Sequence, residues 1–190
     1  KKIKESDTVY LGVYRKTDVL SVGGFDDDGV VISEDSALNY RLRVRGLKIV
    51  VDPNLKVSYP AKETFGQLAR QYLIYGGAKG YIMNKYKKLF AVRQIIPLIF
   101  FASYIFSIVI AFFGNIEYFV GINVIYISAI TFIFFFEEIP KELKLRKTIS
   151  LFYFIKACFI MHLCWSIGFL NKFLFKDRFD FIYGRREIQL

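Results

Sequence analysis

The chain has 190 residues, of which 54% are hydrophobic, and it carries a formal net charge of +10. Soluble domains rarely reach this hydrophobic content, and the longest apolar runs lie in the carboxyl-terminal half, so we expect an integral membrane protein with a soluble amino-terminal part. Cys158 and Cys164 form neither a CxxC pair nor a metal-binding spacing. They are interpreted as small packing residues and give no sign of an oxidising compartment.

The amino-terminal part alternates short strand-like and helix-like patterns separated by turn residues. In chain order we expect a strand at 8–14, a short helix at 15–24 ended by glycine, a loop at 25–32, a helix at 36–45 ended by Gly46, a buried strand at 47–52 and a second short strand at 55–60. Glycine suits a helix end because it adopts the left-handed backbone conformation without steric cost.

A longer helix is predicted from about Thr64. It runs toward Gly76, Gly77 and Gly80, which we interpret as the turn that leads into the membrane. These glycines with Lys79 do not form a nucleotide-binding fingerprint, because no strand precedes them in a βαβ unit.

Two adjacent carboxylates, Glu34 and Asp35, stand where the helix at 36–45 begins. Asp is a favoured helix cap, and a carboxylate there is stabilised by the helix dipole by about 0.3–1 kcal/mol. The alternative is a proton acceptor at a reaction centre. Arg41, Arg43 and Arg45 near the end of this helix are interpreted as a solvated face.

Three apolar runs, at about 95–114, 118–136 and 149–170, approach the ~20 residues that a helix needs to cross a bilayer. They divide the chain into a soluble part, residues 1–92, and a membrane region, residues 93–190.

The basic residues predict the orientation of the chain. They cluster before the first run and again at 137–148, whereas the turn at 114–118 has none. By the positive-inside rule the soluble part is cytoplasmic and this turn is external. The third run is followed by a basic tail, so it either crosses and leaves that tail outside, or lies in the membrane interface.

Five short motifs follow one another in the soluble part of the chain. They are YR at 14–15, VGGFD at 22–26, EDSALNYRLRVRG at 34–46, KIVVDPNLKVSYP at 48–60 and LARQYLIYGGAKG at 68–80. Together they resemble the second half of the catalytic domain of family 2 glycosyltransferases, and most closely the membrane-bound branch that builds bacterial exopolysaccharides such as succinoglycan. The resemblance covers residues 8–90, and the membrane region only in general character.

The resemblance implies an α/β fold of the GT-A type, with residues 1–92 as its acceptor-side, carboxyl-terminal half and the first half missing from this chain. It implies an inverting transfer of a sugar from a nucleotide-diphosphate donor. Asp35 matches the general base of the family, and Glu34 supports it. Gly23 and Gly24 match a turn at which the backbone approaches a sugar closely.

A second family motif, Q-x-x-R-W, is matched only in part. Gln71 stands at its first position and Tyr75 at its last, but Ile74 replaces the arginine. Arg70 is the candidate replacement cation. This departure favours the addition of one sugar per acceptor over processive synthesis.

The resemblance also implies a cofactor and partners. The family uses a divalent cation, Mg or Mn, whose ligands we expect outside this chain. The Asp26–Asp28 string matches the metal-binding DxD only as a string, because its place after VGGF corresponds to an acceptor-side loop. The implied partners are a nucleotide-sugar donor, a polyprenyl-linked saccharide acceptor and the plasma membrane. We expect no nucleic acid, because no basic stripe with interleaved exposed aromatics occurs.

Two alternatives stay open. The chain is an inactive, truncated glycosyltransferase, or it is a membrane protein without enzymatic activity whose basic cytoplasmic part binds anionic lipid.

Overall fold

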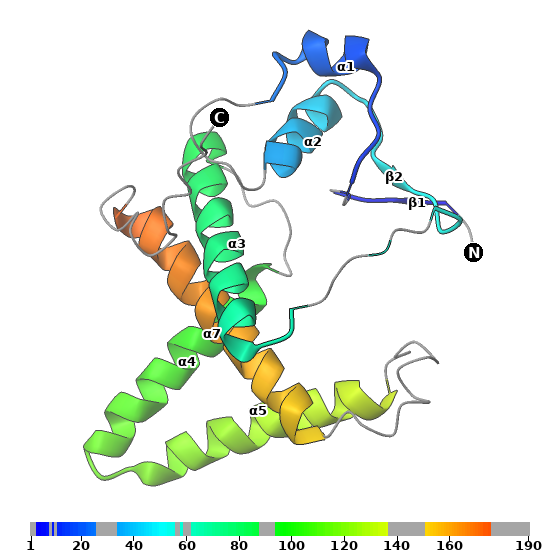
Figure 1. Ribbon diagram of the computed structural model, residues 1–190. Coiled ribbons are helices and arrows are strands. Elements are labelled where there is room, and N and C mark those ends of the chain that lie inside the picture. Colours follow the sequence, from blue (N-terminus) through cyan, green and yellow to red (C-terminus); the bar gives the residue numbers. More distant parts are fainter. Residues whose placement is uncertain are drawn as a thin grey trace.

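A computed structural model describes residues 3–7, 9, 11–25, 34–55, 58, 62–87, 94–136 and 151–175. This part of the chain is mostly helical (Figure 1). Its elements are β1 (Lys4–Glu5), α1 (Lys16–Ser21), α2 (Glu34–Val44), β2 (Val50–Val51), α3 (Phe65–Tyr86), α4 (Ile95–Phe112), α5 (Ile116–Phe136) and α7 (Leu151–Phe175).

The amino-terminal part is built around one face of α2. Leu38 and Leu42 of this helix are buried together with Ile49, which precedes β2. Four partly buried side chains pack against them, those of Val9, Tyr14, Val19 and Val22. Full burial of one aliphatic side chain contributes about 1.5–3 kcal/mol, so this small cluster is the main apolar stabilisation of the region.

The sheet is smaller than the sequence predicts. Residues 11–14 of the expected strand at 8–14 are not in a strand, and the expected strand at 47–52 is reduced to β2. That strand pairs antiparallel with β1, with Lys4 opposite Val51. Val50 and Val51 are 51% and 44% exposed, so none of the described elements forms a second layer over this ladder. The expected α/β layer is therefore not formed by the described residues, and the strand at 55–60 lies mostly outside them.

Both predicted glycine helix ends are confirmed. Gly23 and Gly46 have φ values of +87° and +84°. After α1, Gly24 N–H donates to the carbonyl of Val19, and after α2, Leu47 N–H donates to that of Leu42. Each pattern is a Schellman motif, which satisfies carbonyls that a helix end leaves without partners.

The prediction of a turn at the three glycines of α3 is wrong, because the helix runs through all of them to Tyr86. It begins where expected, since the hydroxyl of Thr64 caps it by accepting from Gln67 N–H at 3.2 Å. Gly76, Gly77 and Gly80 are buried in its second half.

These glycines are buried because α3 and α7 pack backbone against backbone. A Cβ atom at Gly76 would lie 1.9 Å from the carbonyl oxygen of Trp165, and one at Gly80 would lie 2.4 Å from that of Phe169. On α7, a Cβ at Gly168 would lie 2.0 Å from the carbonyl oxygen of Leu73. Small residues on both helices therefore permit an approach that any side chain would block.

The three predicted apolar runs form α4, α5 and α7, each long and apolar enough to cross a membrane. This indicates a multi-pass membrane protein. Figure 1 shows α4 and α5 diverging from the turn near Gly114, with α7 passing across their open end. Cys158 and Cys164 are half-buried free thiols in α7.

The close contact at Gly76 predicts whether an alanine there stabilises or destabilises the protein. Alanine normally stabilises a helix interior by up to about 1 kcal/mol relative to glycine. We expect Gly76→Ala to destabilise the protein instead, by about 1–3 kcal/mol, because the added methyl group overpacks the α3–α7 contact. The thermal unfolding midpoint in detergent should fall by several degrees.

Gly121→Ala in α5 is the matched control, because nothing lies within 4 Å of its added Cβ. It should leave the midpoint unchanged or raise it. If Gly76→Ala also raises the midpoint, the close approach of α3 and α7 is wrong.

Candidate functional site

Both predicted catalytic carboxylates lie in the first turn of α2, which begins at Glu34 rather than after the pair. Asp35 Oδ1 accepts a hydrogen bond from Ser36 N–H at 2.6 Å, which fixes the carboxylate against the helix end. Glu34 Oε2 is buried and has no hydrogen-bond partner among the described residues. A buried acceptor of this kind marks a position where a ligand or water donor would be favourable.

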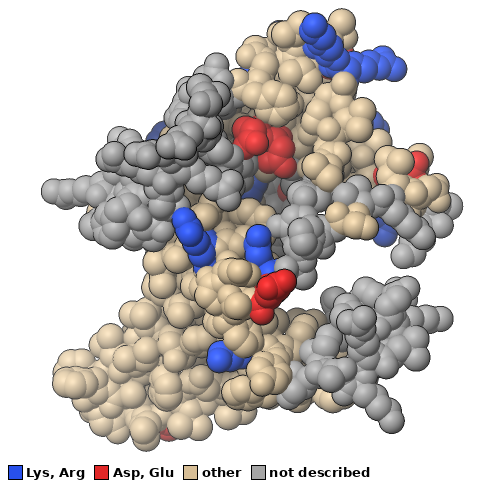
Figure 2. Space-filling model, in the orientation of Figure 1, with Lys and Arg blue, Asp and Glu red and all other residues tan. Residues whose placement is uncertain are grey.

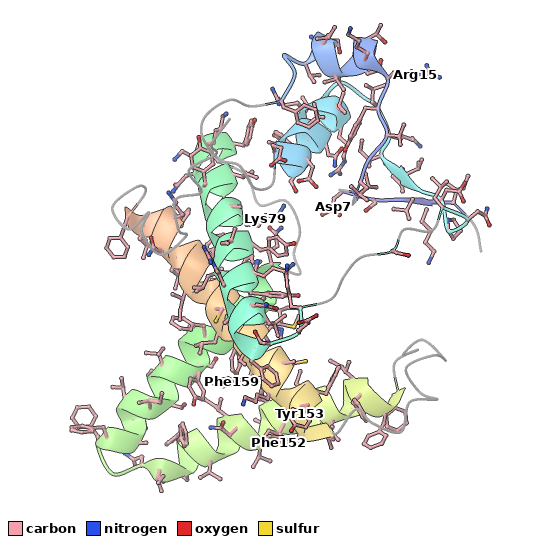
Figure 3. The ribbon with its side chains drawn as sticks, in the orientation of Figure 1. Asp7, Arg15, Lys79, Phe152, Tyr153 and Phe159 are labelled. Atoms are coloured by element: carbon pink, nitrogen blue, oxygen red, sulfur yellow. The ribbon has the colours of Figure 1, made fainter. Side chains whose placement is uncertain are left out.

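The first turn of α2 contacts α3 through a lysine that the sequence did not single out for a site. Figure 3 labels this residue, Lys79, on α3. Its Nζ donates to Ser36 Oγ at 2.7 Å, and Ser36 directly follows the two carboxylates in the chain. The rings of Tyr40 and Tyr86 pack 5.1 Å apart further along the two helices. A cation on α3 is therefore held beside the acidic pair on α2.

Gln71 and Tyr75, the two predicted substrate-binding residues of α3, are in contact, since Gln71 Nε2 donates to Tyr75 Oη at 2.8 Å. They precede Lys79 by eight and four positions, so all three lie on one face of the helix. The structure thus brings the partial Q-x-x-R-W match to the face that meets α2. Arg70 is exposed and lies about 100° around the helix from Gln71, so it does not join them.

Acidic and basic side chains lie on neighbouring parts of this surface. Figure 2 shows acidic side chains at the surface where α2 lies nearest to α3, with Lys and Arg side chains below them along the α3–α7 part of the molecule. Groups of opposite charge therefore lie on the same side of the molecule as the site.

Tyr14 and Asn39 extend the site on the other flank of α2. Tyr14 Oη donates to Asn39 Oδ1 at 2.9 Å, and Asn39 is fully buried. Burial raises the pKa of the Tyr14 phenol; the hydrogen bond to Asn39 lowers it, and the nearby Asp35 carboxylate raises it. Tyr14 is therefore a neutral hydrogen-bond donor close to the proposed base.

Gly23 and Gly24 are tied to α2 by an arginine. Arg41 Nη1 donates to the carbonyl of Val22 at 2.9 Å, and Nη2 donates to that of Gly24 at 2.6 Å. The interpretation of all three arginines as a solvated face is therefore wrong for Arg41. The predicted sugar-side turn is held by the same helix that carries Asp35, nearly two turns further along it.

The described residues do not fit a metal centre. Within the described ranges, no three His, Cys, Asp or Glu side chains come together in a way that could hold a metal ion. The Asp26–Asp28 string lies outside those ranges.

The site therefore combines two carboxylates, an ammonium group and a neutral phenol around the start of α2. A carboxylate can accept a proton, and an ammonium group can bind an anionic oxygen. Four residues of this site had no predicted role: Tyr14, Asn39, Arg41 and Lys79. The four-residue spacing of Gln71, Tyr75 and Lys79 was the one signal that could have added a residue to the predicted set.

No protein-family model, no curated protein and no solved structure matches this chain. The assignment of a function therefore depends on the residues and on the geometry described above.

The Arg41 contact can be tested in isolation. Arg41→Ala removes two hydrogen bonds from a charged donor, each contributing about 1.5–3 kcal/mol. We expect amide hydrogen exchange in residues 16–24 to accelerate at least about tenfold, since a tenfold change corresponds to about 1.4 kcal/mol. Arg43→Ala, at an exposed position of the same helix, should leave exchange there unchanged. Equal acceleration in both variants would contradict the role of Arg41.

Proposed function

We propose that this chain carries the acceptor side of an inverting glycosyltransferase, which moves a sugar from a nucleotide-diphosphate donor to a polyprenyl-linked saccharide at the membrane. The observation that carries the proposal is the contact between Lys79 and Ser36, because it holds the carboxylates of α2 against the helix that precedes the apolar hairpin. The five ordered motifs supply the resemblance to family 2 enzymes, and a GT-A fold for the complete catalytic domain is part of this proposal.

Asp35 is the proposed general base. The acceptor hydroxyl oxygen attacks the anomeric carbon of the donor, and its proton moves to the Asp35 carboxylate as the new bond forms. The bond between the anomeric carbon and the diphosphate oxygen breaks, and its electron pair leaves with the nucleoside diphosphate. The hydrogen bond from Ser36 N–H supports this role, because it restricts the orientation of the carboxylate.

The other residues are proposed to bind and orient the acceptor. Glu34 accepts a hydrogen bond through its buried, unpartnered oxygen, and Tyr14 lies on the opposite flank of α2. Lys79 attracts the phosphate of a lipid-linked acceptor toward the acidic pair. Gln71 and Tyr75 present an amide and a phenol on the same face of α3, which suits the hydroxyl groups of a sugar.

The Gly23–Gly24 turn has a weaker role in this proposal, and Arg70 has none. The backbone of the turn is accessible at Gly24, because nothing lies within 4 Å of a Cβ atom added there. A sugar could approach the backbone closely at this point. Arg70 lies on another face of α3, so we do not assign it to the acceptor. The donor-binding residues and the cation that the family uses are expected outside this chain.

The substitution Asp35→Asn tests the proposed base. In the complete enzyme, in native membranes, we expect it to lower sugar transfer to the polyprenyl-linked acceptor by about 10²-fold or more, because an amide cannot accept the proton. The measurement is the incorporation of labelled sugar into the lipid fraction. The amount of protein in the membrane should not change.

Asp18→Asn, at a half-buried first-turn position of α1, is the matched control and should retain normal transfer. Near-normal turnover in Asp35→Asn would remove the base assignment. If the wild-type protein shows no transfer with any nucleotide-sugar donor, the alternatives of an inactive fragment or a lipid-binding protein are favoured.

A further inference from the structure

Helix α2 and the carboxyl-terminal half of α3 lie on the same side of the membrane. Helix α2 contains Glu34, Asp35 and two arginines, so it lies outside the hydrocarbon core. It contacts the second half of α3 at Lys79 and at Tyr86. The carboxyl-terminal half of α3 therefore lies on the same side of the membrane as α2.

The amino-terminal end of α3 lies on that side as well. If α3 crossed the bilayer, the 13 residues between Val51 and Phe65 would have to cross back to reach its start. Thirteen residues are too few for a spanning helix, which needs about 20. The described residues among them, 52–55, 58 and 62–64, are not helical and include Asp52 and Glu63. Non-helical backbone is not tolerated in contact with lipid. Both ends of α3 are therefore on the side of α2.

Helix α7 runs parallel to α3 along its full length. At the start, Tyr153 stacks on Phe65, with ring centroids 6.2 Å apart. In the middle, the glycine contacts described above join the two helices. At the end, Asn84 Nδ2 donates to the carbonyl oxygens of Lys172 and Phe173, at 3.2 and 2.8 Å. Because α3 does not cross the bilayer, α7 beside it does not cross either.

The contacts of α7 with the α4–α5 hairpin agree with this orientation. Phe159 packs on Phe100 and Tyr126, and Phe154 packs on Phe134. These partners lie in the first half of α4 and in the middle and end of α5, away from the Gly114 turn. Helix α7 therefore lies across the open end of the hairpin rather than along it.

The charges of the helix pair suit the phospholipid headgroup layer. Residues 65–87 and 151–175 contain no Asp or Glu. Their basic residues are Arg70, Lys79, Lys85, Lys87, Lys156 and Lys172. Exposed apolar side chains, such as those of Phe152 and Leu174 (67% and 60% exposed), accompany them on α7. A basic helix with an exposed apolar face is typical of the membrane interface, where anionic lipid adds about 1 kcal/mol per basic residue.

We propose that α3 and α7 lie together in the headgroup layer, on the side of the membrane that carries α2, and that only α4 and α5 cross the bilayer. The basic tail after α7 then lies on the same side as the basic loop at 137–148, which agrees with the positive-inside rule. This proposal does not depend on sugar transfer.

The single tryptophan of the chain, Trp165, measures the depth of α7 directly. It lies two residues from the middle of the helix, so a crossing α7 would hold it near the bilayer centre. We expect lipids brominated near the headgroup to quench its fluorescence more strongly than lipids brominated near the acyl methyl end. Equal or stronger quenching by the deep bromines would overturn the proposal. The double variant Trp165→Phe/Ile167→Trp moves the tryptophan to an exposed position of the same helix. The headgroup-brominated lipids should again quench its fluorescence more strongly.

The sidedness of the chain gives a second measurement. In a background with Cys158→Ser and Cys164→Ser, three variants each carry one new cysteine, at Lys48, Asn115 or Leu190. Sealed membrane vesicles that contain each variant are treated with a maleimide that cannot cross the membrane. We expect positions 48 and 190 to react from one side and position 115 from the other. Reaction of position 190 from the side of position 115 would show that α7 crosses. Reaction of all three from one side would equally contradict the proposal, because the hairpin would then not cross.

Discussion

The close approach of α3 and α7 at Gly76, Gly80 and Gly168 is the contact on which the rest of the structure depends. It requires positions without a Cβ on both helices, since any side chain there would meet a backbone carbonyl. Such packing is useful near lipid, where helices gain little from hydrophobic burial and associate through close van der Waals contact. The contact holds one face of α3 and leaves another face free to receive α2.

The position of the carboxylates follows from this arrangement. Ser36 on α2 meets Lys79 on α3, and Gln71 and Tyr75 lie on the same face of that helix. The acidic pair is thus held beside α3, the helix that precedes the apolar hairpin. If the substrate is a polyprenyl-linked saccharide, its sugar lies at the membrane surface, which is where a proton acceptor is needed.

Local sequence patterns predicted the features that depend on local physics. The apolar runs form α4, α5 and α7 within a few residues of the expected bounds, because length and hydrophobicity alone define such segments. The ends of α1 and α2 at Gly23 and Gly46 follow from the left-handed backbone that glycine permits. The position of Asp35 at the start of a helix was predicted in the same way.

Features that depend on distant partners were missed or misread. The glycines of α3 suggested a turn, because glycine is unfavourable inside a helix, and their actual reason is a helix almost ninety residues further along the chain. Arg41 looked like a solvated residue, because its acceptors, Val22 and Gly24, lie 19 and 17 positions upstream. The strand at 8–14 needed a pairing partner that the described residues do not provide.

Disulfide cross-linking tests the parallel pairing of α3 and α7 most directly. In a background with Cys158 and Cys164 replaced by serine, the pair Asn84→Cys/Phe173→Cys should form a disulfide in oxidised membranes, because Asn84 contacts the backbone at Phe173. The pair Phe65→Cys/Phe173→Cys should not, because these residues lie at opposite ends of the helix pair. Cross-linking of Phe65→Cys with Phe173→Cys, and not of Asn84→Cys with Phe173→Cys, would contradict the account.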